Sequence, residues 1–204
     1  GPVAAPGGPA EGRRACGDAP PQRPGMVGVG ERSAAGALYR EGRRPLGDGA
    51  QGFVEGIRRL ERTTGIIFAV ENMFPWRGPR NTEVRAYSPG WDPTSRDYDH
   101  LTLDLSHAST SRQKSRDLVD AWAERLTHVH LTDGDGSIAD LHLFPGEGDQ
   151  EAHKVMATLA SRGFAGHVVL ELNTRTIGSR SAREDALARA LDWTREALTV
   201  PVVR

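Results

Sequence analysis

Carboxylate and imidazole side chains stand at the ends of four short apolar runs in the second half of the chain. The runs IIFAVEN, LTLDLSH, HVHLTD and VVLELN place Glu71, Asp104, His130 and Glu171 near their C-terminal ends. Short continuous apolar runs are typical of buried parallel strands, and in a β/α barrel the C-terminal strand ends meet at one rim. Carboxylates and imidazoles together bind Zn²⁺, Mn²⁺ or Co²⁺, and carboxylates also bind Mg²⁺. The pattern therefore predicts a metal-dependent enzyme, or the part of one that carries most of the ligands.

Alternation along the runs supports this interpretation. Successive side chains of a strand point to opposite faces, so Glu71, Glu171 and His130 occupy the last inward position of their runs. His128 shares a face with His130 but lies one pleat deeper, and we interpret it as a core histidine with satisfied hydrogen bonds. We expect three other histidines to be structural or exposed, namely His100, His153 and His167.

Apolar residues at helical spacing separate the runs. Three sets of such residues predict three helices, and a glycine that would stop a helix follows the first and the third, at Gly65 and Gly163. The sets are Phe53, Ile57 and Leu60; Leu118, Trp122 and Leu126; and Val155, Met156 and Leu159.

A last helix is predicted after VVLELN. Residues 181–184 read as a capping box that opens it, and Leu187, Leu191 and Leu198 are expected to face the core. Strands and helices alternate, which is the pattern of parallel β/α architecture.

The first quarter of the chain has a different composition. Residues 1–50 hold 12 of the 24 glycines and 7 of the 13 prolines, without helical or alternating periodicity. Such a segment buries too little surface to offset the entropy of ordering. We expect residues 1–50 to be disordered, either as a misread or displaced segment or as a natural extension, and residues 51–204 to form one folded unit.

Four strands are half of the eight that close a barrel. Residues 51–204 are therefore expected to be the C-terminal half of an α/β (β/α)8 TIM barrel, with the N-terminal half truncated. An open sheet edge would need a partner, so a homo-oligomer is a further expectation.

Composition narrows the function classes. The opening GPVAAPGGPA lacks the pattern of a secretory signal, and the sequence has no apolar run long enough to span a membrane, so we expect a cytoplasmic protein with no membrane partner. Cys16 is the single cysteine, which excludes an internal disulfide. The net charge of −1 argues against nucleic acid as a partner, although a local basic groove stays compatible with it.

A series of motifs resembles one superfamily. The segments AVENM, DLSH, HLTD, DLH with FPGEGD, and LELN look like the successive strand-end motifs of the xylose isomerase-like barrels, which include sugar isomerases, epimerases and endonuclease IV. The epimerase branch implies one metal ion held by Glu71, Asp104, His130 and Glu171. The endonuclease branch implies further ligands, which match His107 beside Asp104 and the pair Asp140 and His142. For His107, the alternative is a role in capping the turn after Asp104.

The resemblance implies a reaction on a sugar or sugar phosphate. A divalent ion chelated by the sugar's carbonyl and neighbouring hydroxyl lowers the cost of an enediolate, while Glu71 and Glu171 remove and return a proton. An abasic-site endonuclease like endonuclease IV is the second possibility, although the chain has no histidine before His100 to complete a trinuclear zinc site. An inactive barrel fragment is the third.

Two segments are candidates for substrate contacts. The long connection between Met73 and Asp99 contains Trp76, which could supply an apolar wall, and Arg77 or Arg80, which could pair with an acidic group. An exposed loop with solvated arginines is the alternative. The glycines of residues 145–148 fit either a phosphate site before a helix near Asp149 or a tight turn.

Overall fold

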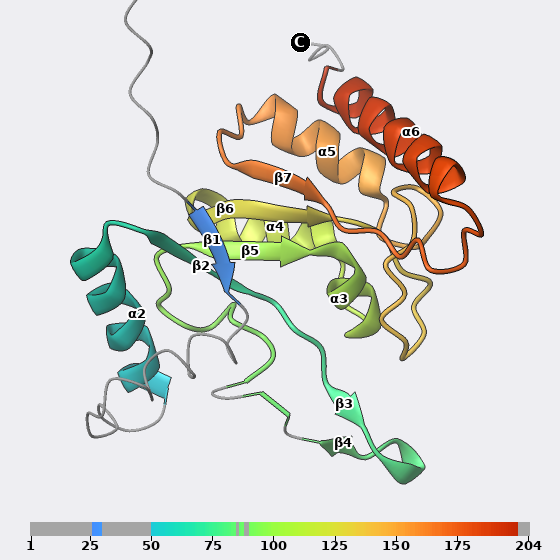
Figure 1. Cartoon of the computed structure of the whole chain (residues 1–204). Coiled ribbons are helices and arrows are strands. Elements are labelled where there is room, and N and C mark those ends of the chain that lie inside the picture. The colour runs from blue at the N-terminus through green and yellow to red at the C-terminus, as the bar shows by residue number, and fades with distance from the viewer. Residues whose placement is uncertain (1–25, 30–49, 85, 88–89, 200–204) are drawn as a thin grey trace, which may run out of the picture.

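The protein forms a five-stranded parallel sheet that carries helices on its face. The computed structural model describes residues 26–29, 50–84, 86–87 and 90–199 (Figure 1). The strand order is β1-β2-β5-β6-β7, and every neighbouring pair in this sheet is parallel. The strands are β1 (Met26–Val29), β2 (Ile67–Glu71), β5 (Leu101–Asp104), β6 (Leu126–Leu131) and β7 (His167–Leu170).

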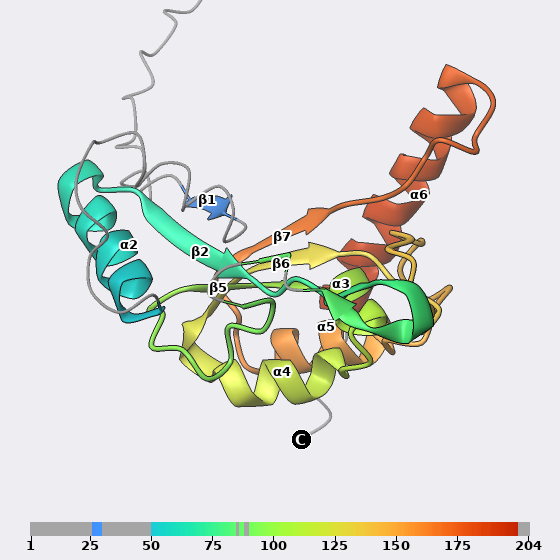
Figure 2. The ribbon, with the colours of Figure 1, turned by 90° about the horizontal axis from the view of Figure 1, so that it is seen from below.

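Helices connect the strands. α2 (Ala50–Thr64) precedes β2, the short α3 (Leu105–Thr110) and α4 (Ser115–Trp122) follow β5, α5 (Ala152–Ser161) follows β6, and α6 (Arg180–Leu198) follows β7. α4 and α5 lie against the same side of the sheet (Figure 2). Two short 3-10 turns occur at Pro79–Asn81 and Ala123–Arg125.

The core lies between the sheet and the helices α2, α4 and α5. Its largest fully buried side chains include Trp122 of α4, Leu103 of β5 and Met156 of α5. Each such side chain contributes about 1.5–3 kcal/mol through removal of apolar surface from water. This packing fixes the strands, and with them the side chains at the strand ends.

The predicted parallel β/α architecture is confirmed, with one strand more than the four expected. β1 pairs in parallel with β2 and lies within the segment predicted to be disordered. The strand has only four residues, MVGV, and a run of this length is too short to be recognised from its periodicity. Residues 1–25 and 30–49, which include Cys16, lie outside the described part of the chain, so the proposed boundary near Gln51 stays a prediction.

Two helix predictions need correction. α4 ends at Trp122, and Leu126 is the first residue of β6 rather than part of the helix. α6 begins at Arg180, one residue before the predicted capping box, because the side chain of Ser179 accepts the N–H of Ala182.

The buried face of α6 also differs from the prediction. Leu187 and Leu191 are 42% and 41% exposed, and Leu198 is only partly buried against the core. The buried residues are small ones, Ala186, Ala190, Thr194 and Ala197. Small side chains allow α6 to approach its neighbours closely, which places the adjacent leucines outside the contact.

The connection between β2 and β5 contains a small hairpin. Strands β3 (Trp76–Arg77) and β4 (Glu83–Val84) pair antiparallel and form a sheet of their own. In the part of the chain that the structure describes, no helix has the length and apolar character needed to cross a bilayer.

Candidate metal centre

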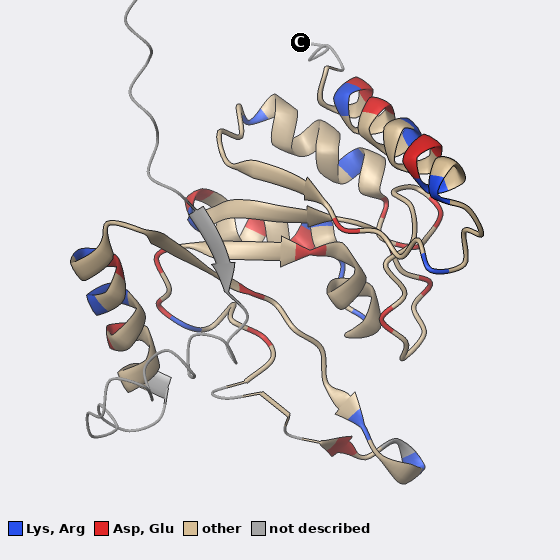
Figure 3. Cartoon of the chain, in the orientation of Figure 1, with Lys and Arg blue, Asp and Glu red and all other residues tan. Residues whose placement is uncertain are grey.

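The four strand-end ligand candidates meet at the C-terminal edge of the sheet. Glu71 and Asp104 are the last residues of β2 and β5, His130 is the penultimate residue of β6, and Glu171 directly follows β7. Asp104 and His130 are partners in the strand register. Figure 3 shows acidic residues at the arrowhead end of β5, where this cluster forms.

One group of ligand atoms surrounds His130. Its Nδ1 lies 2.9 Å from Glu71 Oε1, 3.0 Å from Glu171 Oε2 and 3.4 Å from Asp104 Oδ2. Glu71, Asp104 and His130 each offer a ligand atom, and these atoms lie within 4.8 Å of one another. The predicted convergence of the four strand ends is therefore observed.

One carboxylate oxygen of Asp104 accepts a hydrogen bond, and the other accepts none from the described residues, although His130 Nδ1 lies 3.4 Å from it. Asp104 Oδ1 accepts the N–H of His107 and caps α3, which is the capping contact that the sequence analysis gave as the alternative for His107. Its Oδ2 is buried and accepts no hydrogen bond from the residues that the structure describes. A buried carboxylate oxygen without a donor is unfavourable unless a cation or another donor approaches it.

A second group lies beside the first and shares Asp104 with it. Ligand atoms of Asp104, His107 and His142 also lie within 4.8 Å of one another. Asp140 Oδ2 lies 3.0 Å from His142 Nε2 and 3.4 Å from His107 Nε2. The two sets of residues that the resemblance implied are thus adjacent in space.

Hydrogen bonds to main-chain oxygens orient the two histidines of the second group. His107 Nδ1 lies 2.8 Å from Asn72 O, and His142 Nδ1 lies 3.2 Å from Glu171 O. A carbonyl oxygen only accepts, so both Nδ1 atoms carry the proton. In the neutral imidazoles both Nε2 lone pairs are then directed toward Asp140, which is the arrangement that ligating histidines require.

The sequence analysis missed two residues that support the ligands. The Asn72 side chain donates to Asp104 O at 3.0 Å and accepts Asp104 N at 2.7 Å. Ser106 Oγ donates to Asp140 Oδ1 at 2.7 Å and accepts the N–H of His142. Both lie next to predicted ligands in AVEN and DLSH, but a polar neighbour alone gave no signal of a supporting role.

The carboxylates and imidazoles shift one another's pKa strongly. Burial raises the pKa of Glu71, but hydrogen bonds from His107 and His130 outweigh burial and lower it to about 2. Burial lowers the pKa of the histidines, but the carboxylates outweigh it and raise the pKa of His107 to about 11, of His130 to about 12 and of His142 to about 9. Without a bound ion, protons on the imidazoles thus balance the acidic charge.

The remaining histidines follow the prediction in part. His128 is buried, as expected, but its Nδ1 has no hydrogen-bond partner among the described residues, so it is not the satisfied core histidine we predicted. Burial and the charges of His130 and His167 lower the pKa of His128 to about 4. His153 and His167 are exposed, and His100 is half-buried.

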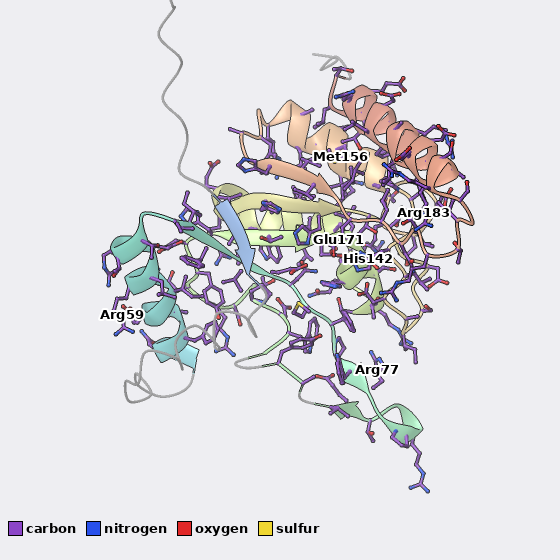
Figure 4. All side chains as sticks on the ribbon, viewed as in Figure 1. Arg59, Arg77, His142, Met156, Glu171 and Arg183 are labelled. Atoms are coloured by element: carbon purple, nitrogen blue, oxygen red, sulfur yellow. The ribbon has the colours of Figure 1, made fainter. Side chains whose placement is uncertain are left out.

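The predicted substrate contacts on the long connection lie on the hairpin. Trp76 is 47% exposed and its indole N–H donates to Tyr87 Oη at 3.1 Å. Figure 4 shows Arg77 on the hairpin, apart from His142 and Glu171. A cavity of about 420 Å³ lies instead beside the cluster, lined by Asp140, His142, Glu171 and residues 172–175 of the loop that follows β7.

The glycine run at residues 145–148 forms a tight turn. The N–H of Gly146 donates to Asp133 Oδ2, that of Glu147 to Phe144 O, and that of Gln150 to Asp133 Oδ1. α5 begins only at Ala152. These main-chain donors already have acceptors, which favours the turn over the phosphate site.

Comparison with known proteins identifies the family. A family model described as xylose isomerase-like TIM barrel matches residues 26–197. The chain belongs to the xylose isomerase-like TIM barrel family. Uncharacterized proteins of Mycobacterium tuberculosis and Mycobacterium leprae are 38% and 36% identical to it over 167 residues. Each match covers 73% of this chain and 60% of the relative, so the chain spans less than two thirds of these curated relatives.

Solved structures share the fold. A D-tagatose 3-epimerase-like protein superimposes with a TM-score of 0.54 at 21% identity, over 86% of this chain and 65% of the other. The 3-keto-D-glucoside 4-epimerase of E. coli gives a TM-score of 0.52 at 18% identity, over 72% and 53%. The partial barrel of this xylose isomerase-like chain is thereby established.

Proposed function

We propose that the chain carries the metal-binding and proton-transfer residues of an isomerase or epimerase that acts on a sugar or sugar phosphate. The observation that carries the proposal is the convergence of Glu71, Asp104, His130 and Glu171 around one point at the strand ends. Two structures of the same fold belong to proteins named as an epimerase and as epimerase-like, which supports this reaction class.

The residues of the first group fit a divalent cation. The buried Oδ2 of Asp104 accepts no hydrogen bond from the described residues. A mixed carboxylate and imidazole set suits Zn²⁺, Mn²⁺ or Co²⁺, and the carboxylates also admit Mg²⁺. Glu71, Asp104, His130 and Glu171 would hold the ion. When bound, a divalent ion supplies Lewis-acid stabilisation of negative charge on a carbonyl oxygen.

The two glutamates are placed for proton transfer. Glu171 has a side chain that is 49% exposed and lines the cavity, so its carboxylate reaches a bound substrate. It removes the proton from the carbon next to the carbonyl group, and the C–H electron pair moves onto the carbonyl to give an enediolate. Glu71 comes from β2 on the other side of the cluster and is a carboxylate at neutral pH, so it first takes up a proton from water and then delivers it to the opposite face of the enediolate. The opposite assignment, with Glu71 as the base, is the alternative, and Glu71 is the more buried of the two glutamates.

Isotope exchange tests the proposal without knowledge of the substrate. The chain is loaded with Mn²⁺ or Co²⁺ and incubated in D₂O with a panel of ketohexoses and ketohexose phosphates, and NMR detects replacement of a carbon-bound proton by deuterium. We expect exchange that depends on the ion and that falls at least 100-fold in Glu71→Gln and in Glu171→Gln, because general acid–base catalysis contributes about 10²–10⁴-fold. Glu147→Gln, on an exposed loop, is the control. Near-normal exchange in both glutamine variants would exclude the paired-glutamate mechanism.

The second ligand group favours one alternative function. Asp140, His107 and His142 provide the ligands that the endonuclease branch adds to the epimerase set. An enzyme of that kind would bind two or more Zn²⁺ ions per chain and cleave a duplex that contains an abasic site. Cleavage by the zinc-loaded chain, without deuterium exchange into sugars, would favour the endonuclease. Ion binding with neither activity would indicate an inactive barrel fragment.

A further inference from the structure

Asp133 lies outside both ligand groups and is fully buried two residues after the end of β6. Its carboxylate accepts three main-chain N–H groups. Oδ1 accepts those of Gly134 at 3.0 Å and Gln150 at 3.1 Å, and Oδ2 accepts that of Gly146 at 3.0 Å. Three donors on one buried carboxylate form a strong set of charge-assisted hydrogen bonds.

The main chain of Asp133 also forms hydrogen bonds to the residues that follow it in the sequence. Its N–H donates to Leu143 O at 3.0 Å, and its carbonyl accepts the N–H of Leu143 at 2.9 Å. Residues 134–150 therefore return to Asp133 at Leu143, Gly146 and Gln150. We call this segment the 134–150 loop.

The packing of the 134–150 loop leaves no space for extra atoms near Asp133. A Cβ at Gly148 would overlap Gly134 O and Asp133 Oδ1, and a Cβ at Gly134 would overlap the Ser109 side chain. Glycine at these two positions is therefore a packing requirement, and it lets the loop close over the Asp133 carboxylate.

The loop carries Asp140 and His142 of the second ligand group. His142 adopts a positive φ of 49°, which a non-glycine residue rarely does without support from its surroundings. It directly precedes Leu143, where the loop is bonded to the Asp133 main chain on both sides. The position of the His142 ring thus depends on how the loop is anchored.

We propose that Asp133 is a positioning residue, which anchors the 134–150 loop so that Asp140 and His142 meet His107. The hydrogen bonds described for Asp133 all go to main-chain atoms of the loop, through which it acts on the three side chains. The inference takes Asp140, His107 and His142 as metal ligands, as the alternative endonuclease function does, and it does not depend on the proposed epimerase reaction. It predicts that the second ligand group depends on Asp133 and that the first group does not.

The variant Asp133→Asn keeps the shape of the side chain but replaces one acceptor oxygen with an NH₂ donor, which would face a main-chain N–H. Asp135→Asn is the matched control, because Asp135 lies on the same loop and the hydrogen bonds described for its side chain reach no further than Ser137. The first readout is NMR of the metal-free chain, in which the ring resonances of His142 and His107 should shift in Asp133→Asn while those of His130 stay in place.

The second readout is titration with Zn²⁺ alone. We expect affinity at the second group to fall about 10- to 100-fold in Asp133→Asn, as for other residues that orient metal ligands, while affinity at the first group is kept. If the wild-type chain shows no second Zn²⁺ ion, the second group is not a metal site, and the ring resonances alone decide whether Asp133 positions it. Unchanged His142 and His107 resonances in Asp133→Asn would overturn the inference.

Gly148→Ala provides a second test if Asp133→Asn folds poorly. The added methyl group would push against the Asp133 carboxylate and Gly134 O and should shift the same ring resonances. Gly166→Ala is its control, because a Cβ there would overlap Thr127 O at the other end of the sheet. A general loss of packing would affect both glycine variants alike, whereas anchoring of the loop predicts an effect on His142 only in Gly148→Ala.

Discussion

His130 places one ring nitrogen within 3.4 Å of three carboxylate oxygens, those of Glu71, Asp104 and Glu171. In the metal-free chain this nitrogen is protonated, because the surrounding carboxylates raise the pKa of His130 to about 12, with burial acting in the opposite direction. A divalent cation needs the neutral imidazole. Metal binding therefore exchanges protons for an ion within a cluster that is already assembled.

This exchange predicts proton release. At pH 8, Zn²⁺ binding should release at least one proton per ion, which calorimetric titration in buffers of different ionisation enthalpy would measure. Protonation of His107 and His130 also stabilises the metal-free chain, because the pKa of each is higher in the folded chain than in the unfolded one. This stabilisation is complete below about pH 6.5 and is lost progressively as the pH rises to about 11 to 12. The melting temperature of the metal-free chain should therefore fall between these pH values. Zinc binding without proton release would contradict the assigned protonation.

A second prediction concerns the charge of the substrate. Arg175 lines the cavity beside Glu171, whereas Arg77 lies on the hairpin. If the substrate is a sugar phosphate, Arg175→Gln should raise KM about tenfold for the phosphorylated sugar and little for the neutral sugar, because one charge-assisted contact contributes about 1.5–3 kcal/mol. Arg77→Gln is the control. A larger effect of Arg77→Gln would restore the sequence prediction that placed this role on the hairpin.

The sequence predicted the candidate ligands better than the residues that support them. Glu71, Asp104, His130 and Glu171 were detectable because an ionisable residue at the end of an apolar strand is unusual. Asn72, Ser106 and Asp133 act through main-chain atoms of residues up to 36 positions away, as in the bond from His142 N to Ser106 Oγ. Contacts of this kind depend on the folded chain and have no counterpart in residue spacing.

At the scale of elements, periodicity located the long helices and the buried strands but not their exact limits. α3, which is capped by Asp104, spans only six residues, and this length is too short for a helical pattern to be recognised in the sequence. In α6 both leucines and alanines recur at helical spacing. The sequence analysis predicted that the leucines face the core, whereas the buried residues in the structure are mainly alanines.

The register of α6 gives a prediction about stability. Leu187→Ala should change the free energy of unfolding by less than about 0.5 kcal/mol, because Leu187 is exposed. Ala190→Leu should cost about 1–3 kcal/mol, because it adds volume at a buried contact. Urea denaturation would measure both. A larger loss in Leu187→Ala than in Ala190→Leu would mean that the leucines face the core after all.

At the scale of the whole molecule, β7 lies at one edge of the described sheet, and Val169 on it is 44% exposed. An exposed edge with apolar side chains is a site for strand pairing between chains. We predict concentration-dependent self-association of the chain, weakened by Val169→Lys. Val84→Lys, at an equally exposed valine of the hairpin, is the control. Sedimentation velocity that shows a monomer at all concentrations would remove β7 as an association site.

The two carboxylate oxygens of Asp104 have different roles, one in the stability of the fold and one in the proposed metal site. One caps α3 and the other faces the metal group. Asparagine also caps helices well, so an Asp104→Asn change would keep the helix and remove a charge from the centre. A single substitution at Asp104 would thus keep the fold and remove one proposed metal ligand. The fold would therefore tolerate a substitution at Asp104 that the proposed metal site would not.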